Sequence, residues 1–497
     1  MLVVVLGRNS VWNSSGSGER ATPGFRIQWN VIALIAILLI AFALRIYRLN
    51  SGLWHDEILT YVRYVSIPVG ESITTFTDKN QHFLFTILSH ASIRIFGDTN
   101  WALRLPAVLF GVASLWALYL FGCAVTTPRE ALLATALLTF SYHHVWFSQN
   151  ARGYTGLLFW TILTSWLFLR GLRESKPRIW LLYAAATALG VYTNMEILFV
   201  VATHFLLYLM ELYKRKENWP EKWFPMLGFF AAGLLTFQLH ALVLPQVIGG
   251  VAGEESTVPA WKSPMWTILE FVKALEIGFS GALIALASLA VFAAGLYGFW
   301  QTNRVVVYLL IIPSVICGAV AIGMGHHVWP RFFFFAFGFA TLVVVRGTMI
   351  VGEGLAKLFG SARGVTAGTV LCVLLICVSA LSIPYAYSSK QDYEGALVFL
   401  EQNKKPDDAI ATVGLASFDY KNFYKTGWKE IQTLDDLNVV RSHARRTWLV
   451  YTFPTHVRAV YPQIWGSIQS DFKVIRTFSG TVGDGVIFVC RSDIPPS

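Results

Sequence analysis

The feature that most constrains this chain is a series of apolar runs, each about as long as a bilayer-crossing helix. Crossing a hydrocarbon core of about 30 Å takes roughly 20 predominantly apolar helical residues. The first run covers residues 30–48, and we expect it to be an uncleaved anchor because a polar Gly/Ser-rich stretch precedes it. Ten more runs lie near 102–122, 131–147, 154–170, 179–195, 197–212, 225–244, 279–300, 305–324, 332–346 and 365–384. The sequence therefore predicts a mainly α, polytopic membrane protein with about eleven transmembrane helices.

Composition agrees with this interpretation. Of the 497 residues, 55% are hydrophobic and 14% are charged, whereas soluble proteins contain about 25% charged residues. A cytosolic globular enzyme and a disordered chain are thereby excluded. The net charge of +10 does not indicate nucleic acid as a partner, because basic residues of membrane proteins collect in cytoplasmic loops.

The basic residues fall in alternate loops and so predict the orientation. They are Arg129; Arg170, Arg173, Lys176 and Arg178; Lys214, Arg215, Lys216 and Lys222; Arg304; and Arg346, Lys357 and Arg363. Residues 1–29 carry three more arginines and are expected to be a cytoplasmic N-terminal segment. An odd number of crossings then places the carboxyl end outside the membrane.

The spans and loops divide the chain into three predicted parts. Segment 1–29 is followed by a transmembrane domain over 30–384 with a large first outer loop, 49–100. Within that loop, the short apolar stretch 82–96 is expected to lie in or partly enter the outer interface. The near-neutral tail, 389–497, alternates strand-like and helix-like runs, which predicts an extracytoplasmic α/β domain with a mostly parallel sheet.

Polar residues at membrane depth are costly unless they line a cavity, so their clusters indicate a site. Three clusters share the predicted outer face. The first lies at the two ends of the first outer loop and contains Trp54, His55, Asp56, Glu57, Lys79, Asn80 and His82. A carboxylate partly desolvated beside apolar surface can act as a general base near neutral pH. A merely solvated acidic pair is the alternative.

The second and third clusters each contain one arginine. Arg152 belongs to SQNARGY at 148–154, which ends in Tyr154. Arg331 ends GHHVWPR at 325–331 and precedes four phenylalanines. The planar guanidinium group suits phosphate, although an interfacial arginine can instead extend to lipid headgroups. A cation beside aromatic rings suits a prenyl chain that ends in a phosphate.

Cofactor motifs are missing from the sequence. His326 and His327 are weak metal ligands, because adjacent helical positions point about 100° apart and no third ligand is nearby. Whether a divalent cation takes part stays open. There is no P-loop, G-x-G-x-x-G, G-x-S-x-G or H-E-x-x-H motif. The sequence therefore indicates no certain cofactor.

Several short motifs occur in a consistent order over about residues 30–350. They are LWHDE at 53–57, NQHFLF at 80–85, IFG at 95–97, RLPAVLFG at 104–111, SQNARGY at 148–154 and WPRFFF at 329–334. With them the chain resembles polytopic glycosyltransferases of the GT-C superfamily. The resemblance is to the branch of protein O-mannosyltransferases and lipid A aminoarabinose transferases, that is, family 39-like glycosyltransferases.

The resemblance implies roles for individual residues. An acidic residue of the first outer loop deprotonates the acceptor hydroxyl, which assigns the catalytic role to Asp56, with Glu57 orienting the site or engaging an arginine such as Arg152. Binding of the donor phosphate or lipid is assigned to Arg152, Arg331, His82, Lys79 and Tyr154. Acceptor contacts or shaping of the site are assigned to Trp54, His55, Asn80, His326 and His327.

The sequence and the resemblance together predict an integral-membrane hexosyl- or pentosyltransferase. It would move one sugar from a polyprenyl phosphate to a hydroxyl of a glycan, lipid or protein acceptor, in a single inverting displacement outside the bilayer, with a bacterial inner membrane expected. The alternative is a transporter or flippase of lipid-linked saccharides. A passive anchor for a C-terminal binding module is least favoured, because eleven spans exceed what anchoring needs.

Overall fold

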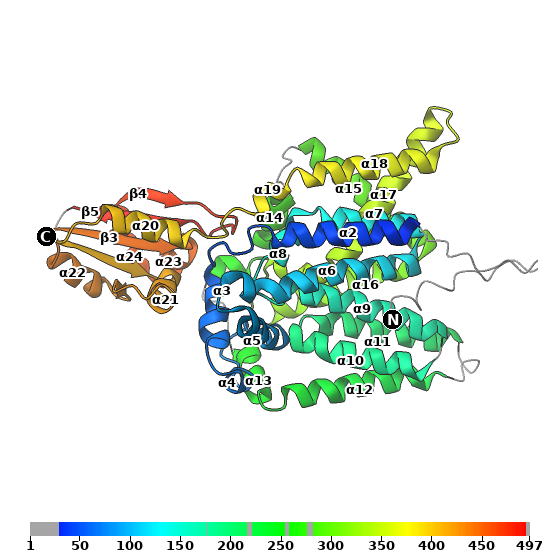
Figure 1. Ribbon diagram of the computed structural model, residues 1–497, viewed down its shortest axis with the longest axis horizontal. Coiled ribbons are helices and arrows are strands. Elements are labelled where there is room, and N and C mark those ends of the chain that lie inside the picture. Colours follow the sequence, from blue (N-terminus) through cyan, green and yellow to red (C-terminus); the bar gives the residue numbers. More distant parts are fainter. Residues whose placement is uncertain (1–28, 175, 216–220, 254–257, 276–281, 494–497) are drawn as a thin grey trace, which may run out of the picture.

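The computed structural model describes residues 29–174, 176–215, 221–253, 258–275 and 282–493. Long helices run side by side in a bundle, and a small α/β unit lies at one end of it (Figure 1). The mainly α fold with a C-terminal α/β unit is confirmed. Apart from Trp29, the predicted segment 1–29 lies outside the described residues.

Each predicted apolar run forms one helix or two consecutive helices. They are α2 (Trp29–Ile46), α6 (Asn100–Val125), α7 (Pro128–Thr139) with α8 (Tyr142–Ser148), α9 (Tyr154–Glu174), α10 (Pro177–Thr193), α11 (Ile197–Arg215), α12 (Trp223–His240) with α13 (Leu244–Gly253), α15 (Ala282–Thr302), α16 (Arg304–Gly323), the 3₁₀ helix η4 (Pro330–Ala336) with α17 (Phe337–Leu358), and α18 (Gly364–Ala380). Side-chain caps fix several starts: Thr99, Thr127 and Asn303 each accept a backbone N–H bond.

Several of these helices are long and apolar enough to cross a bilayer, so the chain is a multi-pass membrane protein. The predicted count of eleven is not confirmed: seven helices of the described residues qualify, or eight if α12 and α13 form one span bent by 93°. The shortfall has a physical reason. Helix α7 has only 12 residues before the break that precedes α8, and α10 and α18 have 17 each, which is the lower end of the length of a spanning helix.

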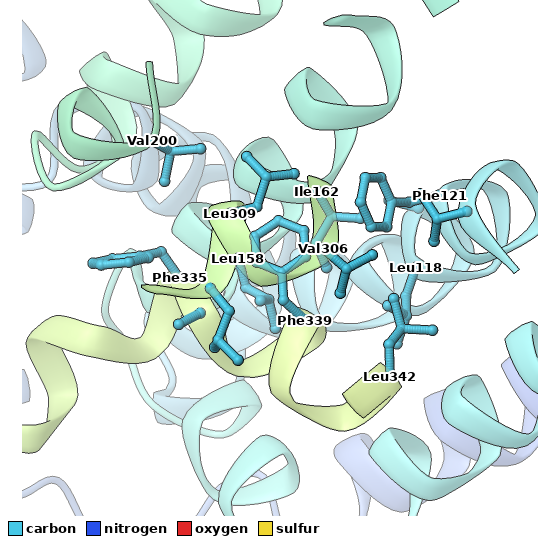
Figure 2. Packing of buried hydrophobic residues seen from close by; sticks show 14 of the residues in the cluster. Leu118, Phe121, Leu158, Ile162, Val200, Val306, Leu309, Phe335, Phe339 and Leu342 are labelled. Atoms are coloured by element: carbon cyan, nitrogen blue, oxygen red, sulfur yellow. The ribbon is translucent and has the colours of Figure 1, made fainter. Parts of the chain in front are cut away.

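The bundle core is built from the inward faces of α6, α9, α11, α16 and α17. Figure 2 shows this packing, in which Phe121 of α6, Ile162 of α9 and Phe339 of α17 come together. Small residues bring other helices close, as lipid-embedded helices require. A Cβ atom on Gly295 of α15 would overlap the carbonyl oxygen of Val343 of α17. The bundle therefore gives the loops at its ends a rigid base.

The first outer loop folds over the end of the bundle nearest the α/β unit (Figure 1). It forms α3 (His55–Thr60), the π-helical turn η1 (Tyr61–Val65), α4 (Val69–Ser72) and α5 (Phe83–Phe96). Helix α5 covers the stretch predicted as interfacial and has 14 residues, fewer than a span needs. The 3₁₀ helix η3 (Pro259–Lys262) and α14 (Pro264–Leu275) lie in the connection between α13 and α15. Its residues Glu254 and Glu255 lie outside the described residues.

The α/β unit contains a five-stranded sheet in the order β2-β1-β3-β5-β4. The strands are β1 (Asp408–Val413), β2 (Lys429–Ile431), β3 (Arg446–Thr452), β4 (Lys473–Phe478) and β5 (Ile487–Ser492). The helices are α19 (Ile383–Ala386) in the linker, then α20 (Tyr393–Asn403), α21 (Leu415–Asn422), α22 (Leu434–Ser442), α23 (Pro454–Val460) and α24 (Pro462–Asp471).

The expectation of a mostly parallel sheet is wrong. Strands β2, β1 and β3 are parallel, but β5 pairs antiparallel with both β3 and β4. No helix separates β4 from β5, and a parallel pair needs a long crossover, so these two strands can only form an antiparallel pair. The carboxyl ends of the parallel strands β1 and β3 lead to α21 and Phe453.

A continuous apolar cluster joins the α/β unit to the bundle. Ile58 of α3 and Phe85 of α5 share this cluster with Tyr393 of α20 and Trp448 of β3, all of them buried. Phe453, which follows β3, has a φ of 51° and packs against Trp261 of η3. The α/β unit is therefore seated on the folded outer loop.

Candidate active site

Two adjacent carboxylates open the short helix α3 and point to different partners. Asp56 and Glu57 occupy its first turn, and Trp54 is its N-cap. Adjacent helical positions point about 100° apart, so the two side chains cannot serve one ligand in the same way. Trp54 fixes the start of the helix, because its indole Nε1 donates to Asn150 Oδ1 at 3.0 Å.

Asp56 lies between the two arginines singled out in the sequence. Its Oδ2 accepts a hydrogen bond from Arg331 at 2.9 Å, and an Arg152 guanidinium nitrogen lies 3.5 Å from the same oxygen. The carboxylate is buried, with 7% of the residue exposed. Burial alone would raise the pKa of Asp56, but Arg331 and then Arg152 outweigh it and hold this pKa below its usual value. Asp56 is therefore ionised in the absence of ligand.

Glu57 forms a separate, fully buried ion pair with Arg104 of α6. The two guanidinium–carboxylate bonds measure 2.7 and 2.6 Å, and both side chains are 0% exposed. The Ala151 N–H donates to the same carboxylate at 2.7 Å. Glu57 therefore pairs with Arg104 of α6 and meets the 148–154 loop only through the Ala151 N–H, whereas the resemblance had it orient the site or engage an arginine such as Arg152.

Arg152, Asn80, His82 and Tyr154 form one connected group, which reaches Asp56 through Arg152. Arg152 donates to Asn80 Oδ1, and its guanidinium lies 5.7 Å from the centre of the Tyr154 ring. His82 Nδ1 lies 3.0 Å from Thr193 O, so this nitrogen carries the proton and leaves Nε2 as an acceptor. Burial, reinforced by Arg152, lowers the pKa of His82 to about 3. His82 is therefore neutral, and its buried Nε2 has no hydrogen-bond partner in the part of the chain that the structure describes.

The 325–331 cluster reaches Asp56 through Arg331. Arg331 lies over the Trp329 ring at 5.0 Å, and His327 packs edge-on against Trp261 at 5.2 Å. Lys79 contacts His326 at 3.1 Å, which joins the two ends of the predicted site. Among the described residues, no group of three potential ligands for a metal ion occurs. The structure thus connects Lys79 and both histidines with one another and with Arg331, and Asn80 with Arg152, without a metal cluster among the described residues.

His55 connects the site to the α/β unit. Its Nδ1 lies 2.9 Å from the buried carboxylate of Asp419 on α21, and its backbone N–H donates to Gln391 at 3.1 Å. Burial opposes protonation of His55, but the Asp419 carboxylate outweighs it and raises the pKa of this imidazole. His55 therefore ties the helix that carries Asp56 to the tail.

Three residues connected with the candidate site carried no recognisable signal in the sequence. Arg104 lies inside an apolar span, and it was quoted only as part of the motif RLPAVLFG, with no role for its charge. Asp419 lies in a helix with little apolar periodicity. Glu196, between α10 and α11, is subject to the charges of both Arg331 and Arg152. It is an isolated acidic residue in a short connection, so no spacing signal identified it.

Comparisons with known proteins identify the fold. Residues 80–241 match the family model described as dolichyl-phosphate-mannose-protein mannosyltransferase. No curated protein sequence matches the chain. Among solved structures, ArnT from Cupriavidus metallidurans in the apo state is similar with a TM-score of 0.51 and 11% identity, over 93% of this chain and 97% of that one. The predicted resemblance to GT-C glycosyltransferases of the mannosyltransferase and ArnT branch is thereby confirmed.

Two further solved structures are similar at lower scores. ArnT from the same organism bound to undecaprenyl phosphate has a TM-score of 0.45 and 10% identity, over 93% of this chain and 98% of that one. The Archaeoglobus fulgidus oligosaccharyltransferase in complex with Zn and sulfate has a TM-score of 0.49 and 13% identity, over 91% of this chain and 72% of that one.

Proposed function

We propose that this chain is an integral-membrane glycosyltransferase that moves a sugar from a polyprenyl phosphate to an acceptor hydroxyl, with Asp56 as the general base. The observation that carries the proposal is one buried carboxylate oxygen contacted by two arginines at the end of a membrane bundle. ArnT, whose fold this chain shares, has been crystallised with undecaprenyl phosphate, which supports a donor of this class.

The two arginines give the site a way to activate its base when the donor binds. Without donor, Arg331 and Arg152 pair with Asp56 and make it a poor proton acceptor. A donor phosphate attracts the same guanidinium groups, which bind phosphate in parallel hydrogen bonds. Its negative charge then weakens the hold on Asp56, so the pKa of Asp56 rises and the carboxylate becomes able to take a hydroxyl proton.

The transfer itself is proposed to be a single displacement with inversion. Asp56 takes the proton of the acceptor hydroxyl, whose oxygen attacks the anomeric carbon, and the bond from that carbon to the phosphate oxygen breaks. The arginines stabilise the charge that develops on the leaving phosphate in a site with little water. Glu57 is not available as a nucleophile, because Arg104 and the Ala151 N–H occupy its oxygens.

We place this site and the α/β unit on the outer face of the membrane, because the basic loops mark the opposite end of the bundle as cytoplasmic. In a variant without native cysteines, an impermeant thiol reagent added to intact cells should label Ser442→Cys on α22 and spare Gln301→Cys at the end of α15. The reverse pattern would show that the site faces the cytoplasm.

The function is tested by incubating purified protein in liposomes with radiolabelled polyprenyl-phosphate sugars and glycan, lipid or peptide acceptors. We expect label to move onto an acceptor, with free polyprenyl phosphate as the second product. The same vesicles distinguish the alternative predicted from the sequence, a flippase. Movement of intact donor between leaflets, with no label on any acceptor, would contradict a transferase.

A further inference from the structure

A second carboxyl group lies beside the Asp56 site, and the mechanism above gives it no role. Glu196 occupies the short connection between α10 and α11, where its backbone N–H donates to Asn194 Oδ1 at 2.9 Å. Its Oε2 is buried and has no hydrogen-bond partner among the described residues. A buried acceptor without a partner is costly, which makes this atom a candidate for contact with a ligand.

The surroundings of Glu196 overlap those of Asp56. The charges of Arg331 of η4 and Arg152 of the 148–154 loop act on Glu196, and both arginines contact Asp56. Among the described residues, Tyr154 of α9 and Cys317 of α16 also interact electrostatically with Glu196. Both carboxyl groups therefore lie within the electrostatic reach of the same two guanidinium groups, and they come from different segments of the chain.

The two carboxyl groups nevertheless hold their protons differently. Asp56 accepts a direct bond from Arg331, and its pKa lies below the usual value. Glu196 has no such bond, so burial outweighs the pull of Arg331 and Arg152 and raises its pKa well above the usual value. Pairs of carboxyl groups whose environments separate their pKa values are a common arrangement for one base and one acid.

We propose that Glu196 is the general acid of the transfer and gives its proton to the departing phosphate. This inference rests on the proposed function. As the acceptor oxygen attacks, Asp56 takes the hydroxyl proton and the bond between the anomeric carbon and the phosphate oxygen breaks. The bonding electron pair stays on the phosphate oxygen, which receives the proton of Glu196. Exchange with water after product release returns the proton from Asp56 to solvent and restores that of Glu196.

The expected contribution is modest. A phosphate monoester has a second pKa of about 6, so the leaving group is only weakly basic and gains little from protonation at neutral pH. General acid catalysis contributes about 10²–10⁴-fold in other enzymes, and we expect the lower end of that range here. The larger share of leaving-group stabilisation falls to the two arginines.

Glu196→Gln tests this role, because the amide keeps the size of the side chain and can donate a hydrogen bond but cannot give up a proton. We expect kcat to fall by about 10²-fold while the KM for a polyprenyl-phosphate sugar changes less than about threefold. The wild-type rate should also fall at high pH as Glu196 loses its proton, and this basic limb should be absent from the variant. Glu196→Asp, which restores an acid, should recover part of kcat.

Two further variants separate catalysis from structure. Glu211→Gln, at the far end of α11, should leave kcat unchanged, whereas Arg331→Lys should raise the donor KM because an ammonium group lacks the bidentate fork. If Glu196→Gln keeps full kcat and the basic limb, or changes only the donor KM, Glu196 is not the acid. Failure of the proposed function would look different, because the wild-type protein would then transfer no sugar.

Discussion

Replacing Asp56 by asparagine should slow sugar transfer by about 10²–10⁴-fold, the usual contribution of a general base. Asparagine has nearly the same shape and can still accept a hydrogen bond from Arg331, so the fold should persist. Donor binding should not weaken and should even tighten, because Arg331 and Arg152 no longer pair with a competing carboxylate. A fall in kcat with an equal or lower donor KM is therefore the expected signature, measured in the liposome transfer assay.

The same role of Asp56 predicts how kcat/KM and kcat depend on pH. In the free protein the pKa of Asp56 is held below its usual value, so kcat/KM for the donor should fall only at low pH. In the donor complex the phosphate offsets the arginines, so the acidic limb of kcat should lie at higher pH. Asp56→Asn should lose both acidic limbs, because the group that titrates is gone.

A matched control comes from the same outer loop. Asp98 is exposed and accepts a hydrogen bond from Tyr61 at 2.6 Å, outside the cluster around Asp56. Asp98→Asn should retain wild-type kcat and donor KM. If Asp56→Asn transfers sugar at the wild-type rate, Asp56 is not the base, whatever the geometry around it.

The bundle follows from the sequence because the signal for it is local. A run such as 305–324 needs no partner to be recognised, since its length and apolar character alone make it a helix in lipid. The number of crossings depends on where helices end, and breaks such as the one between α7 and α8 have no comparable local signal. The residue positions of the helices were thus predictable, and the number of spans was not.

The candidate site divides in the same way. Asp56 and Arg331 were each identifiable as polar residues beside apolar runs, but their contact joins positions 275 residues apart. No local sequence pattern indicates that Asp56 and Arg331 are in contact. Only the prediction that both lie on the outer face placed them in one hypothetical site. For Glu57 the partner itself was missed, because Arg104 lies within an apolar span and resembled an ordinary helix residue.

The Glu57–Arg104 pair should be the interaction of the site whose disruption by a single substitution destabilises the protein most. Breaking a buried ion pair by removing one partner typically costs about 3–5 kcal/mol, because the other charge stays buried without compensation. Arg104 also donates to the carbonyl groups of Leu49, Ser51 and Gly52, which lead from α2 into α3. Arg104→Met should therefore release the segment between α2 and α3 and displace Asp56, in addition to destabilising the fold.

Glu57→Gln removes the negative charge but leaves the bonds of Arg104 to the segment between α2 and α3 in place. We expect it to lower the free energy of unfolding by about 3–5 kcal/mol, which is measurable as a lower unfolding temperature of the protein in detergent. The pKa of Glu57 is depressed in the folded state by Arg104 acting against burial. The pair therefore stabilises the protein above the ordinary glutamate pKa of 4.5 and loses this effect as the pH falls further.

Glu430→Gln, which removes a partly exposed pair with Lys421, provides the control and should cost at most about 1 kcal/mol. Equal unfolding temperatures for Glu57→Gln and Glu430→Gln would contradict a buried charge at position 57. The double variant Glu57→Gln/Arg104→Met should lose less stability than the two single variants combined, because no charge is then left unpaired. Its transfer rate should stay low, since the carbonyl groups that hold the start of α3 would still lack Arg104.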